Sequence, residues 1–384
     1  MPAIDILERL ISFDTTSRNS NLELIEYVQN LFSEGGIESH IIHDETRTKA
    51  NLYATIGPQN HSGVMLSGHT DVVPVDGQDW SHEPFRLTEK DGKLFGRGTA
   101  DMKGFVAYAI AAMLKASKLS LKTPLHLALS YDEEIGCIGV HSMIEMLASA
   151  PVKPVFCIVG EPTNLTVATG HKGKVALRAT CTGREGHSAL APLALNALHL
   201  GCDFVQEVRQ MQAVLEETGS RDADYDISYT TLHVGKMSGG TVLNIVPNQC
   251  EIDFEIRNVA EDNPEEIIEE FKARASAIVK NYRNKASEAG IAIETRFSYP
   301  GLNTPANADV ITFVKSLTGA NGTCKVAFGT EGGLFSEKLD IPTVVCGPGS
   351  MSQGHKPDEF VSIDQLDQCE AMLGRLLERL ESGI

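Results

Sequence analysis

The stretch Val64-Met-Leu-Ser-Gly-His-Thr-Asp71 decides how the fold of this chain is understood. An apolar run of strand type, 64–66, ends in Ser-Gly and is followed at once by His69 and Asp71. In open α/β sheets, ligands bind beyond the carboxyl ends of the strands. Side chains two residues apart on an extended backbone share a face. The stretch therefore predicts a core strand, and the two polar side chains that follow it suit an imidazole metal ligand and a carboxylate that orients it.

Later segments repeat this arrangement, because each places acids or a histidine after a strand-type run or in a Gly/Pro-rich loop. They contain Asp101 (in 96–104), Glu133 and Glu134 (in 130–134), Glu161 (in 159–163) and His355 (in 347–359). Each has an ordinary alternative: a hydrogen-bonded histidine at a strand end, a helix cap, a solvated acidic pair or a loop acid. Their recurrence favours one shared metal site. Histidine and carboxylates without cysteine suit zinc, manganese or cobalt.

The adjacent pair Glu133-Glu134 also offers a base. Two-metal hydrolases need a carboxylate that takes a proton from water as well as carboxylates that bind metal. Consecutive side chains point to opposite sides of an extended backbone. One glutamate can therefore bind metal while its neighbour faces the water.

Composition bounds the possible partners of the chain. The 384 residues are 42% hydrophobic and 22% charged, with a formal net charge of −18. This acidic balance argues against nucleic acid and anionic membranes as partners. No signal-peptide pattern and no apolar run of the ~18–20 residues that span a bilayer is present. The eight cysteines form no CxxC pair, so we expect a reduced, cytoplasmic chain without a disulfide framework.

Hydrophobic periodicity predicts two domains. Strands at 39–42, 50–56, 64–66, 125–130 and 155–159 alternate with helices at 4–12, 22–33, 102–118 and 141–147, with a long loop at 76–97. This order predicts an α/β domain, residues 1–176 and 300–384, with a mixed, mostly parallel sheet flanked by helices. Further helices at 309–317 and 363–380 and a strand at 343–345 complete it.

The segment between these halves has a different pattern. Strands at 174–182, 225–234, 250–257 and 291–299 alternate polar and apolar residues, and amphipathic helices are expected at 194–215 and 264–280. The β-α-β-β-α-β order predicts an inserted α+β domain, residues 177–299.

The motifs around the five candidate ligands together resemble the M20 family of zinc amidohydrolases and peptidases. The resemblance extends over nearly the whole chain and implies two Zn²⁺ ions per subunit, with Co²⁺ or Mn²⁺ as possible substitutes. It implies that Asp101 bridges the ions. His69 and Glu161 would bind one ion, and Glu134 and His355 the other.

The same resemblance implies the roles of the neighbouring acids. Glu133 matches the general base and Asp71 the residue that orients His69. The peptide bond between Asp101 and Met102 is expected to be cis. A metal-binding protein that has lost catalysis remains an alternative.

The inserted domain resembles the lid and dimerisation domain of the family, which implies a homodimer. His187 matches a residue that reaches the partner's active site and stabilises the oxyanion. Arg257 matches the ligand of the substrate carboxylate, and Asn244 also matches a substrate-contacting position. The roles of His82, His171, Lys172 and His233 stay undecided, as structural or supporting residues.

Segments 160–164, 171–173, 347–350 and 353–359 resemble a branch of the family that hydrolyses the acetyl amide of N2-acetyl-L-ornithine in arginine biosynthesis. Glu331 is predicted to bind the substrate's ammonium group. Other N-acyl amino acids, dipeptides and succinyl-diaminopimelate stay open as substrates, because the metal motifs serve chemistry that all of these share.

Overall fold

The computed structural model describes residues 1–384, which form two compact units. Unit 1 comprises residues 1–171 and 302–384, and unit 2 comprises residues 172–301. The predicted insert, 177–299, lies within unit 2. Both chain ends therefore belong to unit 1.

Unit 1 is built on a nine-stranded mixed sheet. Its order is β1-β2-β6-β3-β7-β17-β8-β15, and β16 pairs with β8. The strands are β1 (Ser39–His43), β2 (Ala50–Ile56), β3 (Val64–His69), β6 (Leu125–Ser130), β7 (Phe156–Pro162), β8 (Val167–His171), β15 (Leu302–Asn303), β16 (Thr323–Val326) and β17 (Thr343–Gly347). The central strands β6, β3, β7 and β17 run parallel, whereas β1, β2 and β15 pair antiparallel. The prediction of a mixed sheet with a parallel centre is confirmed.

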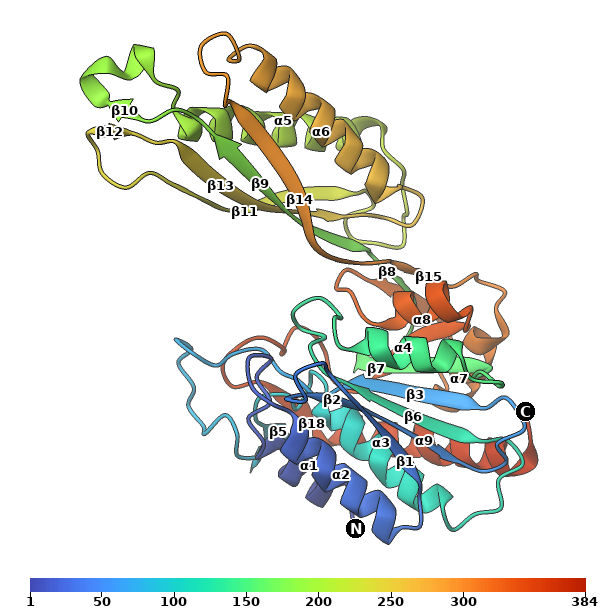
Figure 1. The fold of residues 1–384 in the computed structure, drawn as a ribbon. Coiled ribbons are helices and arrows are strands. Elements are labelled where there is room, and N and C mark those ends of the chain that lie inside the picture. Colours follow the sequence, from blue (N-terminus) through green and yellow to red (C-terminus); the bar gives the residue numbers. More distant parts are fainter. The chain divides into compact units, whose positions relative to one another are not determined.

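Helices cover both faces of this sheet (Figure 1). On one face, α1 (Ala3–Ile11), α2 (Leu22–Glu34), α3 (Lys103–Ala116), α7 (Asp309–Thr318) and α9 (Ile363–Ser382) share one hydrophobic core with the strands. On the other face lie α4 (Val140–Ala148) and α8 (Gly332–Leu339). Helix α3 is apolar almost all round because it is buried against the sheet, α1 and α9. This burial on all sides holds the segment just before it, which carries Asp101.

The predicted long loop at 76–97 is partly wrong, because its second half forms the hairpin β4 (Thr88–Lys90) and β5 (Lys93–Phe95). This hairpin pairs with β18 (Phe360–Ser362) in a three-stranded sheet. Strand β18 follows directly on the His355 loop. The hairpin therefore fixes one end of that loop.

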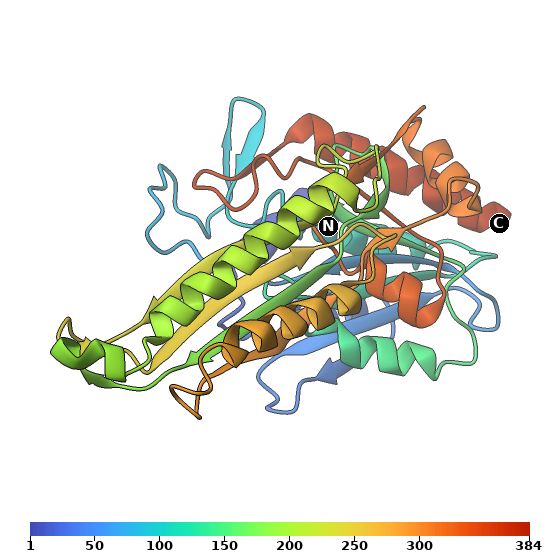
Figure 2. The same cartoon turned by 90° about the horizontal axis from the view of Figure 1, so that it is seen from above.

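Unit 2 has the predicted β-α-β-β-α-β order. Strands β9 (Lys174–Thr182), β11 (Thr231–Gly239), β13 (Gln249–Arg257) and β14 (Gly290–Tyr299) form an antiparallel sheet in the order β11-β13-β9-β14. Helices α5 (Ala197–Thr218) and α6 (Pro264–Lys280) lie side by side on one face (Figure 2). Every second residue of β9 and β13 is buried against them, so the other face of the sheet carries polar side chains.

Two predicted elements of unit 2 differ from the structure. The strand expected from 225 begins only at Thr231, and the helix expected from 194 begins at Ala197. Before α5, the short 3₁₀ helix η1 (Ser188–Leu193) follows β10 (Gly186–His187), which pairs with β12 (Ile245–Val246). No helix of the chain combines the length and the hydropathy that crossing a bilayer requires.

Candidate metal centre

The five predicted metal ligands converge in unit 1. His69 is the last residue of β3, Glu161 lies near the end of β7, and Glu134 follows β6. Because these strands are parallel neighbours, their carboxyl ends meet at one edge of the sheet. Asp101 reaches this edge from the segment before α3, and His355 from the loop between β17 and β18.

Asp101 lies between the two histidines. Its Oδ1 is 3.2 Å from His69 Nε2, and its Oδ2 is 3.1 Å from His355 Nε2. On the outer sides, Glu161 Oε1 is 3.4 Å from His69 Nε2, and Glu134 Oε2 is 3.1 Å from His355 Nε2. Asp101 does not cap α3, whose N-cap is Met102. The peptide bond between Asp101 and Met102 is cis, as predicted.

These spacings fit two divalent cations. Zinc bonds of about 2.0–2.1 Å place neighbouring ligand atoms of a tetrahedron about 3.3–3.4 Å apart, close to the observed 3.1–3.4 Å. Glu134 Oε1 and Glu161 Oε2 are buried without a hydrogen-bond partner. Buried polar atoms normally have partners, so these oxygens are free to bind a cation.

The negative charges of the cluster also favour the binding of cations. Burial, and then the charge of Asp101, raise the pKa of both Glu134 and Glu161. Hydrogen bonds to Asp101 and Glu134 raise the pKa of His355 to about 10. Three buried carboxylates repel one another unless protons or metal ions compensate them. A pair of divalent ions would do so.

Asp71 holds three parts of the site together. The closest acceptor for His69 Nδ1 is the Asp71 backbone carbonyl at 2.9 Å, with carboxylate Oδ1 farther away at 3.6 Å. This contact leaves His69 Nε2 free to bind metal. The Asp71 carboxylate accepts the backbone N–H groups of Glu133 and Glu134, and Oδ2 also accepts the Ser17 hydroxyl at 2.7 Å. Asp71 therefore orients His69 mainly through its backbone and fixes the glutamate pair through its side chain.

Glu133 lies beside the ligands and is half-buried. Burial raises the pKa of its carboxyl group; Glu161 and Glu134 add to the increase, and His69 opposes it. Its Oε1 accepts a hydrogen bond from the Cys137 thiol at 3.4 Å. Cys137 adopts a left-handed backbone with φ of 55°, and its N–H donates to the Glu133 carbonyl at 2.8 Å. This tight turn brings the Cys137 thiol within hydrogen-bond distance of the Glu133 carboxylate.

Glu331 is buried, with 2% of its surface exposed. Burial raises its pKa to about 7, an increase that the nearby Ser130 and Ser67 hydroxyls and His69 oppose. Glu331 Oε1 and both hydroxyls nevertheless have no partner at hydrogen-bond distance. Its carboxyl group thus lies desolvated near the metal centre with unused hydrogen-bonding capacity.

The three other predicted site residues lie in unit 2. His187 and Asn244 are close together, because His187 pairs with Ile245 and the Ser188 N–H donates to the Asn244 carbonyl at 3.0 Å. Arg257 ends β13, and its guanidinium donates to Glu255 and to the Tyr299 hydroxyl. The structure therefore places Arg257 away from the His187–Asn244 pair within this unit.

Sequence reasoning missed several residues that support the centre: Ser17, Gln78, Arg97, Cys137 and Glu359. Arg97 and Glu359 form a buried ion pair at 2.6 Å, and each is 1% exposed. The sequence did offer a signal for this pair, because Arg97 lies in the motif 96–104 and Glu359 in the motif 347–359, each of which contains a predicted ligand. Nothing in the local sequence marks Ser17, Gln78 or Cys137.

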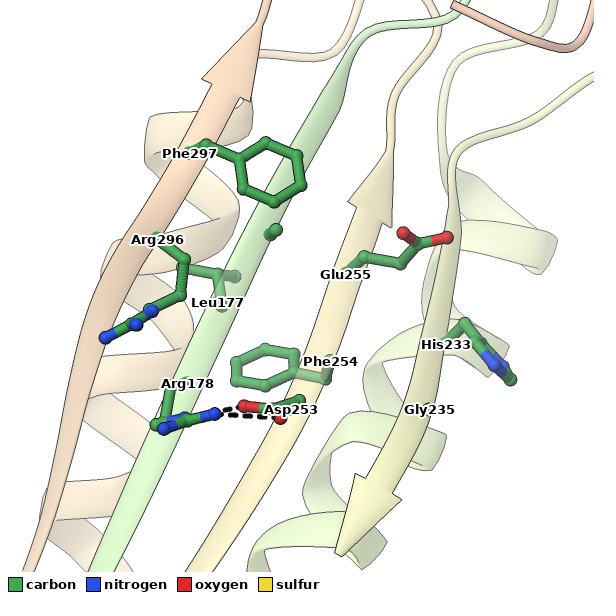
Figure 3. Close-up of a pocket in the computed structure, with 10 residues that line it drawn as sticks. Leu177, Arg178, His233, Gly235, Asp253, Phe254, Glu255, Arg296 and Phe297 are labelled. Atoms are coloured by element: carbon green, nitrogen blue, oxygen red, sulfur yellow. Dashed lines mark hydrogen bonds and ion pairs between the residues drawn. The ribbon is translucent and has the colours of Figure 1, made fainter. Parts of the chain in front are cut away.

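A hollow of about 460 Å³ lies on the open sheet face of unit 2 (Figure 3). Arg178 and Asp253 point toward each other across its floor and form an ion pair at 2.6 Å. Phe297 and Arg296 line one side, and His233 the other. Its central charges satisfy each other, and none of the predicted ligands or catalytic residues lines it.

The chain is similar to known proteins over most of its length. The family model described as peptidase family M20/M25/M40 matches residues 65–379. The chain therefore belongs to this family and is a hydrolase.

Its curated relatives include an acetylornithine deacetylase of Pasteurella multocida, 34% identical over 97% of this chain and 94% of the relative. An acetylornithine deacetylase of Myxococcus xanthus is 33% identical over 98% of this chain and 97% of the relative.

Among solved structures, the M20 family metallo-carboxypeptidase Sso-CP2 of Sulfolobus solfataricus has a TM-score of 0.78 at 19% identity, with all of both chains covered. A Bacillus subtilis protein, described as a dinuclear metal-binding peptidase of the M20 family, has a TM-score of 0.69 at 15% identity, covering 100% of this chain and 98% of that chain. At these identities the two structures support the fold.

Proposed function

We propose that this chain hydrolyses the acetyl amide of N2-acetyl-L-ornithine to acetate and L-ornithine, a step of arginine biosynthesis. The main support for amide hydrolysis is the arrangement around Asp101. Its two carboxylate oxygens lie close to two histidines, and a glutamate lies close to each histidine. The similarity to acetylornithine deacetylases over nearly the whole chain supports the choice of substrate.

In this proposal Asp101 would bind both of two Zn²⁺ ions, with Co²⁺ or Mn²⁺ as possible substitutes. His69 and Glu161 would hold one ion, and Glu134 and His355 would hold the other. When bound, the ions polarise the acetyl carbonyl and lower the pKa of water.

Glu133 acts as the general base. Its half-buried carboxylate takes a proton from the attacking water and returns it to the leaving α-amine. Burial raises the pKa of Glu133, and shifted pKa values are common among catalytic acids and bases. Cys137 holds Oε1, which leaves Oε2 for the proton.

Arg257 binds the substrate carboxylate in this proposal, with Asn244 as a further contact. The Arg257 guanidinium donates hydrogen bonds to Glu255 and to Tyr299, and a guanidinium suits bidentate pairing with a carboxylate. Glu331 binds the δ-ammonium group. A buried carboxylate without a partner raises the free energy of the protein, so pairing with an ammonium group stabilises it more than it would a carboxylate at the surface.

His187 stabilises the oxyanion in the active site of a second copy of the chain. Its Nδ1 accepts the Ala189 N–H at 3.1 Å, which places the proton of the neutral ring on Nε2 as a donor. Nearby apolar side chains are exposed, including Leu243 (99%) and Leu193 (71%). Exposed apolar patches are typical of interfaces, which supports a homodimer formed through unit 2.

Replacing Glu133 by alanine tests the assignment of the base. We expect Glu133→Ala to lose turnover but to keep both metal ions, whereas Glu134→Ala should lose metal as well. Metal content is measured by elemental analysis after gel filtration. If Glu133→Ala loses metal and Glu134→Ala keeps it, the roles of the two glutamates are exchanged.

A further inference from the structure

His355 differs from the other four predicted ligands in how it is held. Its side chain is 49% exposed, whereas those of His69, Asp101, Glu161 and Glu134 are 1–7% exposed. It lies in a loop, and its backbone is left-handed with φ of 60°. The sheet therefore does not fix His355, and another contact has to hold its backbone in place.

Gln78 makes that contact. Its Nε2 donates to the His355 carbonyl at 3.1 Å. Its Oε1 accepts from Arg97 Nη2 at 2.6 Å and from Trp80 Nε1 at 3.0 Å. Arg97 and Trp80 can only donate, so the amide oxygen must face them and the NH₂ must face His355. The direction of the Gln78 amide is thus determined by its partners.

The same network reaches the backbone of Asp101. Arg97 Nη1 donates to Glu359 Oε2 at 2.6 Å. Glu359 Oε1 accepts the N–H groups of Ala100 at 2.9 Å and of Asp101 at 3.1 Å. Gln78, Arg97 and Glu359 therefore connect the backbone of the bridging residue with the backbone of His355. Hydrogen-bonded partners behind metal ligands typically set ligand orientation and metal affinity.

Trp80 is the only tryptophan of the chain. Besides its bond to Gln78, its ring lies 5.0 Å from the Arg97 guanidinium carbon. A change in the position of Gln78 or Arg97 alters the surroundings of the indole.

We propose that Gln78 is a positioning residue for His355, and that Trp80 emission reports whether the His355 half of the metal centre is filled. This inference rests on the proposed metal centre, in which His355 is a ligand. Gln78 is not one of the proposed metal ligands or substrate contacts. It acts by holding the His355 backbone where the imidazole meets Asp101 and Glu134.

Two variants of Gln78 separate its two contacts. Gln78→Glu keeps an acceptor for Arg97 and Trp80 but loses the donor to His355, and Gln78→Ala loses both. The matched control is Ser81→Ala, because Ser81 joins the same loop to the same segment through Asp358 at 2.7 Å and does not touch His355. We expect both Gln78 variants to bind one of the two zinc equivalents about 10–100-fold more weakly. Ser81→Ala should bind it within about twofold of the unchanged protein, because loss of a surface contact has a small effect.

The assay is a Zn²⁺ titration of metal-free full-length protein, followed by Trp80 emission and by elemental analysis. Zn²⁺ is chosen because its filled d shell gives no spectral signal of its own. We expect the emission to change as the His355 half of the centre fills, and His355→Ala to remove that change. If two zinc ions bind but the emission stays constant, or Gln78→Glu binds zinc like the unchanged protein, the inference is overturned and the proposed function stands. If the unchanged protein binds no zinc, both fail.

Discussion

Replacing Arg97 by methionine should destabilise unit 1 strongly. Arg97 and Glu359 are each 1% exposed and lie 2.6 Å apart. The substitution leaves the Glu359 carboxylate buried with only backbone N–H donors. Removing one partner of a buried ion pair costs about 3–5 kcal/mol, so we expect a loss of that size in the free energy of unfolding at pH 8.

The double variant Arg97→Met/Glu359→Gln separates charge from packing. Glutamine keeps an oxygen for the N–H groups of Ala100 and Asp101 but removes the uncompensated charge. The double variant should regain about 2 kcal/mol relative to Arg97→Met alone, within the usual range for coupled neighbours.

Urea unfolding followed by Trp80 emission measures both effects, because the only tryptophan lies in unit 1. Without Arg97, the pKa of Glu359 in the folded state rises further above its unfolded value of 4.5. Stability from such a group is present below the unfolded pKa and is lost as pH rises, so the deficit of Arg97→Met should shrink from pH 8 to pH 5.5. A loss below ~1 kcal/mol, or an additive double variant, would refute this reasoning.

Three further predictions test other parts of the account. Burial lowers the pKa of His126 to about 4 from an ordinary 6.5, so its contribution to stability is full above pH 6.5 and falls toward pH 4. Between pH 8 and pH 5, the free energy of unfolding should fall by about 2 kcal/mol more in the unchanged protein than in His126→Gln. Urea midpoints that change in parallel for the two proteins over this range would contradict the prediction. Cys137→Ala should lower kcat about 2–10-fold through the lost hydrogen bond to Glu133, with KM and metal content unchanged. Cys137→Ser should restore part of kcat, because a hydroxyl can donate the same hydrogen bond. Equal losses of kcat in both variants would exclude a positioning role for Cys137. Glu331→Gln should raise KM for acetylornithine but spare N-acetyl-L-methionine, and equal losses on both substrates would remove Glu331 from ammonium binding.

Strong periodicity made much of the fold predictable. Strand β2, strand β6 and helix α6 have the predicted bounds because each combines a clear apolar pattern with definite end signals. The hairpin β4–β5 was not predictable, since each strand has three residues and depends on β18, more than 260 positions away in the chain. Strand β8 was missed because its Thr and Gly interrupt an already short apolar run.

The ligand cluster was predictable because parallel strands end at one edge of a sheet, and His69, Glu134 and Glu161 all follow or end such strands. The supporting contacts depend on tertiary structure instead. Gln78 meets His355 across 277 positions, and Cys137 reaches Glu133 only through a left-handed turn. Local sequence carries no signal for either contact.

The most direct test of the proposed function is amide hydrolysis at 214 nm by the zinc-reconstituted protein. N2-acetyl-L-ornithine, N-acetyl-L-methionine and N-succinyl-L,L-diaminopimelate are compared at equal metal loading. We predict a kcat/KM at least ~100-fold higher on acetylornithine, which is about 2.7 kcal/mol of transition-state discrimination. A preference for either other compound would contradict the proposed substrate while leaving the metal centre intact, and no turnover of any of the three by fully loaded protein would contradict the proposed activity.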